Sequence, residues 1–364
     1  ILICTVILII IGLVALFSAT QNSNYDELKK QIVWIMVSIP ILIAIIAIDY
    51  ELLIKIAPIL YGIITLLLAG VLFTTPINGA TSWYNIGAVS FQPAELAKIV
   101  IILSLTYTIV KIQARGKKEI NVIYKLAIIL GVAMVPVLLI IKQPDYGTAI
   151  AFIMALIFML FVAGIDKKYI IIAIAVVIVA VPLLYFFILP EHAKTRIDVY
   201  LNPNLDPRGA GYNIIQSKLA IGAGQLFGMG LLKGNQTQLG FLYPKTTDFI
   251  FSVIGEELGF IFAAGIIVLY VVLITKAIYV AKTAKDLEGS YIAAGIAGIF
   301  FFHMLENIGM TMGLLPITGI PLPFVSYGGS SLLSNIIMIG ILLNISGRRQ
   351  KVLSVSYTHL RAHE

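Results

Sequence analysis

Residues 248–274 read DFIFSVIGEELGFIFAAGIIVLYVVLI, an apolar run that opens on Asp248 and carries Glu256 and Glu257 near its start. A helix of this length can cross the roughly 30 Å of hydrocarbon in a bilayer. The run does not alternate between polar and apolar residues, and it exceeds the roughly ten residues of a barrel strand. It therefore predicts a membrane-spanning helix, whose acidic residues need an explanation because carboxylates are costly at membrane depth.

The same kind of apolar run recurs along the whole chain. Of the 364 residues, 60% are hydrophobic and only 12% are charged, about half the charged fraction of a typical soluble domain. We therefore expect an all-α polytopic membrane protein with about ten transmembrane helices. The predicted spans are residues 1–18, 32–48, 53–74, 93–110, 124–141, 147–164, 169–188, 249–274, 291–314 and 323–346.

The net charge of +7 indicates orientation in the membrane rather than binding to nucleic acid. Lys and Arg concentrate in alternate connections and after the last predicted helix, and the positive-inside rule makes that side cytoplasmic. We therefore expect both termini in the cytoplasm and a large extracellular loop at 189–248, between helices 7 and 8. Residues 1–350 read as one membrane domain. We expect the native start upstream of Ile1 and a non-native tail at 355–364.

The predicted loop is punctuated by prolines and glycines, as a water-exposed segment would be. Within it, YNIIQSKLAIGAG at 212–224 predicts a short amphipathic helix that ends at glycine. Its basic residues include Lys194, Arg196, Lys218 and Lys233. Such residues are usually solvated surface charges, but together they could also bind a diphosphate, which prefers Arg and Lys donors. The sequence has no Walker, Rossmann or zinc pattern, so neither ATP-driven nor nicotinamide chemistry is indicated.

Asp248 has two interpretations. With Thr246 and Thr247 it could cap a helix that begins near Phe249. Alternatively, partial desolvation beneath the folded loop would raise its pKa toward that of a useful general base. Glu256 lies eight residues on, on roughly the same helix face, and Glu256 and Glu257 could be functional acids. They could equally make structural hydrogen bonds to a neighbouring helix.

Three other polar motifs enter apolar runs. In FQPAELAKI (91–99), Glu95 and Lys98 lie on one helix face and either form a structural ion pair or position a polar substrate group. In KQPDYGTA (142–149), Asp145 is a helix cap or a site residue. In LPITGIPLPFVSYGGSSLLSN (315–335), Ser330 and Ser331 follow two glycines. That pattern favours close helix packing, with the lining of a polar cavity as the alternative.

These motifs together resemble the SEDS family, which includes RodA and FtsW. The similar segments are, in order, FQPAELAK, QPDYGTA, GAGYNIIQSKLAIGAG, TTDFIFSVIGEELG and GIPLPFVSYGGSS. The segment GNQTQLGFLYPKTTDFIF is more similar to RodA, the elongation member, than to FtsW, the division member. The resemblance implies a ten-helix peptidoglycan glycosyltransferase of the bacterial cytoplasmic membrane. It would polymerise lipid II at the outer face, with a class B penicillin-binding protein as transpeptidase partner.

The resemblance also assigns residues. It places the family's essential aspartate at Asp248 and its buried pair at Glu95 and Lys98. Other motif positions fall on Asp145, Gln216, Ser217, Lys218, Ser330 and Ser331. The family usually has Pro-Glu and a histidine near the aspartate, whereas this chain has PKTTD, which weakens any role for Lys245 and Thr247 but not for Asp248.

The implied reaction needs a base for the acceptor 4-hydroxyl and positive charge at the leaving lipid diphosphate. We expect Asp248 to be the base, and Arg196 and Lys218 to contact the diphosphate. An α-linked donor and a β-1,4 product mean inversion, so one base suffices. Mg²⁺ or Mn²⁺ could assist, although no ligand set in the sequence predicts a metal site. The alternatives are a lipid II flippase without chemistry, or a scaffold for the penicillin-binding protein.

Overall fold

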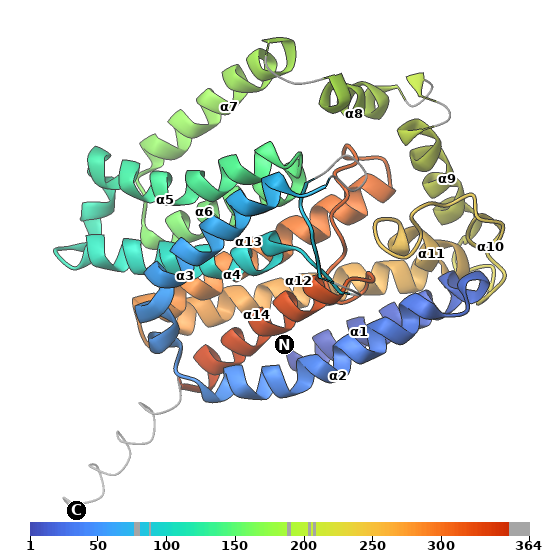
Figure 1. Ribbon diagram of the computed structural model, residues 1–364, viewed down its shortest axis with the longest axis horizontal. Coiled ribbons are helices and arrows are strands. Elements are labelled where there is room, and N and C mark those ends of the chain that lie inside the picture. Colours follow the sequence, from blue (N-terminus) through green and yellow to red (C-terminus); the bar gives the residue numbers. More distant parts are fainter. Residues whose placement is uncertain (76–80, 87–88, 188–190, 203–204, 207–208, 349–364) are drawn as a thin grey trace, which may run out of the picture.

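The computed structural model describes residues 1–75, 81–86, 89–187, 191–202, 205–206 and 209–348, and structural statements below concern these residues. Its helices form a bundle, and its two short strands, β1 (Tyr84–Ile86) and β2 (Val89–Phe91), form an antiparallel hairpin that pairs Tyr84 with Phe91. The predicted tail at 355–364 lies outside the described residues. The all-α prediction is confirmed (Figure 1).

Nine of the described helices are long and apolar enough to cross a membrane. They are α1 (Leu2–Ala19), α2 (Asp26–Ala47), α3 (Tyr50–Gly70, extended to Phe73 by a 3-10 turn), α5 (Ile123–Lys142), α6 (Tyr146–Ala163), α7 (Lys167–Phe187), α12 (Gly259–Thr283), α13 (Leu287–Thr311) and α14 (Gly329–Arg348). The remaining predicted span, 93–110, lies in α4 (Pro93–Gln113), which is outside this set of nine but is 21 residues long. The shorter helices are α8 (Glu191–Leu201), α9 (Ala210–Ala223), α10 (Asn235–Gln238) and α11 (Ile250–Glu257).

Helix α13 forms the centre of the bundle, where it packs against α6, α12 and α4. Small residues allow this close approach. A Cβ atom added at Gly298 would lie 2.8 Å from the Met154 carbonyl oxygen of α6, and one at Gly295 would lie 3.0 Å from Ile102 of α4. In contrast, none of the apolar window of α7 is buried, and α7 lies at the periphery in Figure 1. Polar residues of α13 are therefore held in the most enclosed part of the molecule.

The structure corrects the start of the eighth predicted span. Residues 249–274 do not form one helix, because α11 ends at Glu257 and α12 begins at Gly259. Gly259 has φ +80°, and a Cβ atom there would lie 2.2 Å from the backbone nitrogen of Gly228. The helix is interrupted at this point because the backbone at Gly228 crosses the backbone at Gly259, where only glycine fits. Glu256 and Glu257 therefore precede the membrane helix instead of lying two turns inside it.

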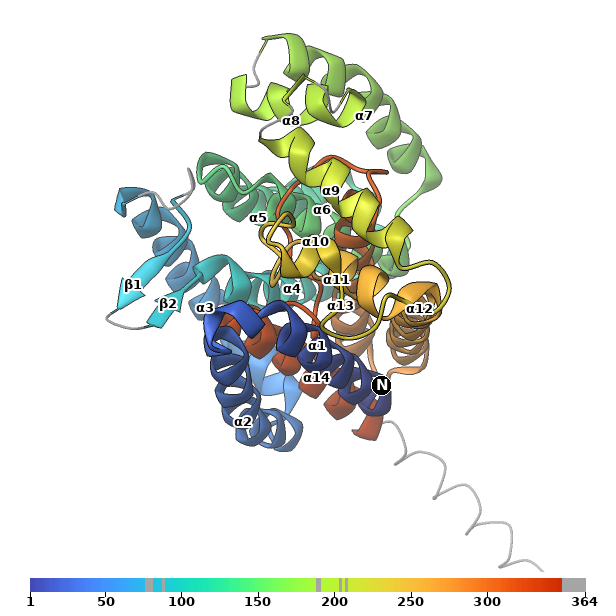
Figure 2. The same cartoon turned by 90° about the vertical axis from the view of Figure 1, so that its right-hand side faces the viewer.

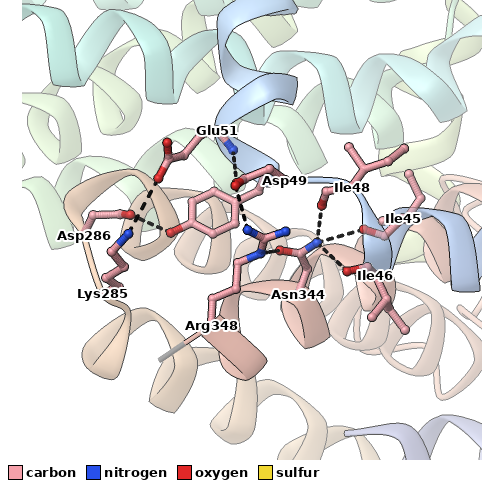
Figure 3. Close-up of polar contacts among 10 residues, drawn as sticks. Ile45, Ile46, Ile48, Asp49, Glu51, Lys285, Asp286, Asn344 and Arg348 are labelled. Atoms are coloured by element: carbon pink, nitrogen blue, oxygen red, sulfur yellow. Dashed lines mark hydrogen bonds and ion pairs between the residues drawn. The ribbon is translucent and has the colours of Figure 1, made fainter. Parts of the chain in front are cut away.

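A polar cluster joins four helix ends on one side of the bundle (Figure 3). Asn344 of α14 donates through Nδ2 to the carbonyl oxygens of Ile45 and Ile46, both at 2.9 Å, and to that of Ile48. It thereby satisfies carbonyls that the end of α2 leaves without helical partners. Arg348 pairs with Asp49 at 2.6 Å. Two further contacts join Tyr50 to Asp286 and Glu51 to Lys285.

Candidate functional site

Asp248 lies on the connection between α10 and α11 and is half-buried. The N-cap residue of α11 is Phe249, with no side-chain capping bond, so Asp248 does not occupy the capping position that its sequence context suggested. Its carboxylate lies beside the backbone of Gly319, where an added Cβ atom would be 3.4 Å from Asp248 Oδ2. Gly319 has φ +76°, a backbone conformation that favours glycine.

Three successive backbone carbonyls fix the peptide segment that carries Asp248. The Thr246 oxygen accepts from the Tyr327 backbone N–H at 2.9 Å, and the Thr247 oxygen accepts from Ser326 Oγ at 2.7 Å. The Asp248 oxygen accepts from Asn307 Nδ2 at 3.0 Å. The donors come from the loop before α14 and from α13, so two distant parts of the chain position this short segment.

The polar face of α13 also holds the loop that lies against Asp248. His303, Glu306 and Asn307 lie at i, i+3 and i+4, so they share one face of the helix. Their partners on the loop are the Pro321 oxygen (3.3 Å from His303 Nδ1), the Thr318 hydroxyl (2.8 Å from Glu306 Oε1) and the Ile320 oxygen (2.8 Å from Asn307 Nδ2). None of these three residues was predicted from the sequence as a site residue. Their helical spacing inside the apolar span 291–314 was the available signal.

A second polar cluster lies at the starts of α4 and α6. Asp145 accepts from the Thr148 backbone N–H at 3.1 Å as the N-cap of α6, and from Gln92 Nε2 at 3.2 Å. Burial raises the pKa of Asp145, the bonds from Thr148 oppose the rise, and the nearby Glu95 adds to it. The capping interpretation of Asp145 is therefore confirmed, and it coexists with a desolvated carboxyl group.

Glu95 and Lys98 form the predicted ion pair, with 2.8 Å between Glu95 Oε2 and Lys98 Nζ. Both side chains are buried, and Ser334 Oγ of α14 donates to Glu95 Oε2 at 2.7 Å. This cluster and Asp248 contact the same loop. A Cβ atom added at Gly147, in the first turn of α6, would lie 2.6 Å from Ile320 and 3.1 Å from Thr318.

Ser330 and Ser331 lie half-buried in the first turn of α14. Ser331 Oγ accepts from Asn335 Nδ2 within the same helix, at 3.3 Å. The preceding Gly329 packs against Trp34 of α2, where an added Cβ atom would lie 2.1 Å from Trp34 Nε1. These contacts support the helix-packing interpretation of the Gly-Gly-Ser-Ser motif.

The predicted amphipathic helix is confirmed as α9, which connects two parts of the site. Ser217 Oγ donates to the Thr311 oxygen of α13 at 2.6 Å and lies 2.6 Å from Ser252 Oγ, four residues after Asp248. Gln216 is half-buried and Lys218 is exposed. Lys218 extends over the end of α13, where a Cβ atom added at Gly313 would lie 2.6 Å from Lys218 Nζ.

Arg196 lies on α8, but its side chain is outside the described part of the structure. Helix α8 reaches the same region as Lys218, because Tyr200 OH donates to the Leu314 oxygen at 3.0 Å. Helices α8 and α9 therefore converge near residues 311–314, at the end of the helix that carries Asn307. Figure 2 shows α8 and α9 in succession along this side of the molecule.

Glu256 and Glu257 accept hydrogen bonds from α10 and from the loop before it, so their structural interpretation is supported, although the partner is not a membrane helix. Glu256 accepts from the backbone N–H groups of Gln236 (2.7 Å) and Thr237 (3.0 Å) and from Thr237 Oγ1 (2.7 Å). Glu257 accepts from Leu232 N (3.1 Å), Gly234 N (3.3 Å) and Gln238 Nε2 (2.9 Å). The two carboxylates thereby fix α10 and the segment before it.

Lys245, where this chain departs from the expected motif, belongs to the same anchored loop. Its Nζ donates to the Thr237 oxygen at 2.9 Å. Burial lowers the pKa of Lys245, against the opposing influence of Glu257 and Glu27. Within the described ranges, no three His, Cys, Asp or Glu side chains are grouped closely enough to hold a metal ion.

Comparisons with known proteins give a consistent result. The family model for FtsW, RodA and SpoVE, described as "Cell cycle protein", matches residues 1–351. The peptidoglycan glycosyltransferase MrdB of Escherichia coli is 40% identical over 301 residues, which cover 82% of this chain and 80% of that protein. The peptidoglycan glycosyltransferase RodA of Treponema pallidum is 31% identical, with 93% of this chain and 95% of that protein covered.

Two solved structures share the fold over almost the whole chain. One belongs to a peptidoglycan synthase complex described as coordinating polymerization and crosslinking, and it has a TM-score of 0.83, 27% identity and coverage of 96% of this chain and 97% of that chain. The other is the rod shape determining protein RodA of Thermus thermophilus, with a TM-score of 0.72, 26% identity and coverage of 96% of both chains.

Proposed function

Because the chain belongs to the FtsW, RodA and SpoVE family of cell cycle proteins, we propose that it is a peptidoglycan glycosyltransferase that polymerises lipid II, with Asp248 as the general base. One observation carries the residue assignment. Asp248 is half-buried, and the carbonyls of Thr246, Thr247 and Asp248 are each held by a partner from elsewhere in the chain. A general base must be held in a fixed position relative to the proton that it takes, and these contacts fix the backbone that carries Asp248.

The reaction assigns a clear task to this carboxylate. The acceptor sugar's 4-hydroxyl oxygen forms a bond to the anomeric carbon of the donor while the bond from that carbon to the lipid diphosphate breaks. The hydroxyl proton passes to Asp248, and the diphosphate departs with the bonding electron pair. The α-linked donor gives a β-1,4 product by inversion, so a single base completes the step without a covalent intermediate.

The leaving diphosphate needs positive charge, and Lys218 and Arg196 are our candidates to supply it. Lys218 is exposed beside the end of α13, and Arg196 belongs to α8, which is joined to the same place through Tyr200. Mg²⁺ or Mn²⁺ is a further candidate for this task.

The other predicted residues have supporting roles in this proposal. Glu95, Lys98 and Asp145 fix the starts of α4 and α6, and Gly147 in the first turn of α6 packs against Ile320 of the loop beside Asp248. Ser217 joins α9 to α13 and α11, and we propose that the neighbouring Gln216 and Lys218 contact the substrate. Ser330 and Ser331 begin α14 beside Ser334, the partner of Glu95.

The chain is a multi-pass membrane protein. We place it in the bacterial cytoplasmic membrane with both termini in the cytoplasm, because Lys and Arg are concentrated on that side of the predicted spans. Asp248 and the segment 189–248 would then face outward, where lipid II is polymerised. We propose a class B penicillin-binding protein as the partner, because a similar chain forms part of a complex that couples polymerization to crosslinking.

The test is lipid II polymerisation by the purified chain with its penicillin-binding partner, whose transpeptidase is blocked by a β-lactam. We expect wild type to form glycan strands and Asp248→Asn to form none while it remains folded and bound to the partner. The matched control is Asp286→Asn, a carboxylate that accepts from Tyr50 in the cluster of Figure 3. If Asp248→Asn polymerises as fast as Asp286→Asn, Asp248 is not the base. Lipid II translocation in liposomes would then test the flippase alternative.

A further inference from the structure

Asn307 is a fully buried amide on α13. Its Nδ2 donates to the Asp248 oxygen at 3.0 Å and to the Ile320 oxygen at 2.8 Å. An amide nitrogen carries two hydrogens, so both are in use. Because both partners are carbonyl oxygens, which only accept, the side chain must present its nitrogen and not its oxygen to them. The orientation of the amide is therefore fixed by its partners.

This orientation has a cost. Asn307 Oδ1 is buried and has no hydrogen-bond partner among the described residues. A buried acceptor without a partner is unfavourable, and an apolar side chain would fill the same space without that penalty. The useful part of Asn307 is therefore its pair of donors, which an apolar residue cannot supply.

The two carbonyls that Asn307 binds belong to the two backbone segments that meet at the Asp248 carboxylate. One belongs to the peptide of Asp248 itself. The other belongs to Ile320, the residue after Gly319, whose backbone lies against Asp248 Oδ2. The same amide therefore fixes the base's own peptide relative to the loop that the carboxylate faces.

We propose that Asn307 is a positioning residue for Asp248, which holds the peptide that carries the base at a fixed distance from the loop beside its carboxylate. The inference rests on the proposed function, because positioning matters for turnover only if Asp248 is the base. Displacing a catalytic group by about 1 Å can slow a reaction by as much as 100-fold. Loss of Asn307 should therefore lower kcat more than it alters KM.

The chain offers a matched control in Asn344. This residue is also a buried asparagine whose Nδ2 binds backbone carbonyls, but it does so in the cluster of Figure 3, at the opposite end of α14 from the Ser326–Tyr327 loop. Asn344→Ala removes a similar set of hydrogen bonds without touching the Asp248 segment. It should lower thermal stability much as Asn307→Ala does and leave kcat within about twofold of wild type.

The experiment compares wild type, Asn307→Ala and Asn344→Ala in complex with the penicillin-binding partner. Lipid II polymerisation gives kcat and KM, and amide hydrogen exchange measured by mass spectrometry follows the peptide 244–250. For Asn307→Ala we expect kcat to fall by about 10- to 100-fold, KM to stay within about twofold and exchange at 246–249 to accelerate. A kcat equal to that of Asn344→Ala, or a loss confined to KM, would overturn the inference.

Two further outcomes of this experiment can be told apart: an inactive wild type, and an Asn307→Ala variant that does not fold. If wild type makes no glycan, the proposed function fails, and the exchange data still decide whether Asn307 holds the segment: faster exchange supports the inference and unchanged exchange overturns it. If Asn307→Ala does not fold, Asn307→Ser replaces it, because a hydroxyl has one hydrogen to donate and leaves one of the two carbonyls without its donor. We then expect about a threefold loss of kcat, and no loss would refute the positioning role.

Discussion

Replacing Glu256 tests whether this acidic residue, which lies in an apolar segment, makes structural hydrogen bonds or takes part in the reaction. Glu256 is fully buried. Its two oxygens accept three hydrogen bonds, from Gln236 N, Thr237 N and Thr237 Oγ1, at 2.7 to 3.0 Å. Alanine leaves all three donors without a partner. Glutamine keeps one acceptor oxygen but turns an NH₂ group toward at least one donor, and it also loses the charge that strengthens these bonds.

The expected effect follows from these contacts. Each buried donor that loses its acceptor costs about 1–3 kcal/mol, and partial access of water to the loop favours the lower half of that range. Three donors therefore give a loss of about 3–6 kcal/mol for Glu256→Ala. In Glu256→Gln the glutamine NH₂ group faces one donor, which loses its acceptor, and the hydrogen bonds from the other donors are weaker. We therefore expect a loss of about 2–3 kcal/mol of stability for Glu256→Gln.

Thermal unfolding in detergent, scanned at one fixed rate, measures the effect. We expect Tm to fall by about 5 °C or more for Glu256→Ala and by roughly half as much for Glu256→Gln. The control is Glu51→Gln, because Glu51 pairs with Lys285 at 3.8 Å with 43% of its side chain exposed. Such surface pairs contribute about 0–1 kcal/mol. If Glu256→Ala unfolds at the wild-type temperature but abolishes polymerisation, the structural assignment of Glu256 is wrong.

Two other predictions concern backbone crossing and pH. Gly259→Ala should destabilise the protein by about 2–5 kcal/mol, because positive φ costs alanine about 1–2 kcal/mol and the clash with Gly228 costs about 1–3 more. The control is Gly265→Ala, where nothing lies within 4 Å of the added Cβ atom, so this variant should not lower Tm. Equal losses of Tm in the two variants would contradict the close crossing of Gly228 and Gly259. For Asp145, the folded-state pKa is raised by burial, so its contribution to stability is present below the unfolded pKa of about 4 and is lost as pH rises through the folded pKa. Asp145→Asn removes this dependence, so the Tm of the variant relative to wild type should fall as the pH is lowered toward the unfolded pKa of about 4. A Tm difference independent of pH would refute the assignment.

The sequence predicted those features that depend on neighbouring residues. Hydropathy identified the spans, because length and apolar content are local properties of a segment. The amphipathic pattern before Gly224 predicted α9, which ends at Ala223. The spacing of Glu95 and Lys98 predicted an ion pair that the structure contains. In each case the residues that determine the feature lie within a few helical turns of one another.

The features that escaped prediction depend on distant partners. The break at Gly259 arises because the segment around Gly228 crosses it, and the residues beside Gly259 do not identify that distant segment. Asn307 and Asp248 are 59 residues apart, and Ser326 and Thr247 are 79 apart. A single sequence shows that Asn307 interrupts an apolar helix but not which carbonyls its amide meets.

The most direct test of the central claim separates binding from turnover at Asp248. Fluorescent lipid II binding and single-turnover polymerisation are measured on wild type and Asp248→Asn, each in complex with the penicillin-binding partner. If Asp248 is the base, the variant keeps its Kd for lipid II within about threefold and its single-turnover rate falls by 100-fold or more, since general-base catalysis contributes about 10²–10⁴. If binding is lost while the rate at saturating lipid II stays near that of wild type, Asp248 holds substrate and another group takes the proton.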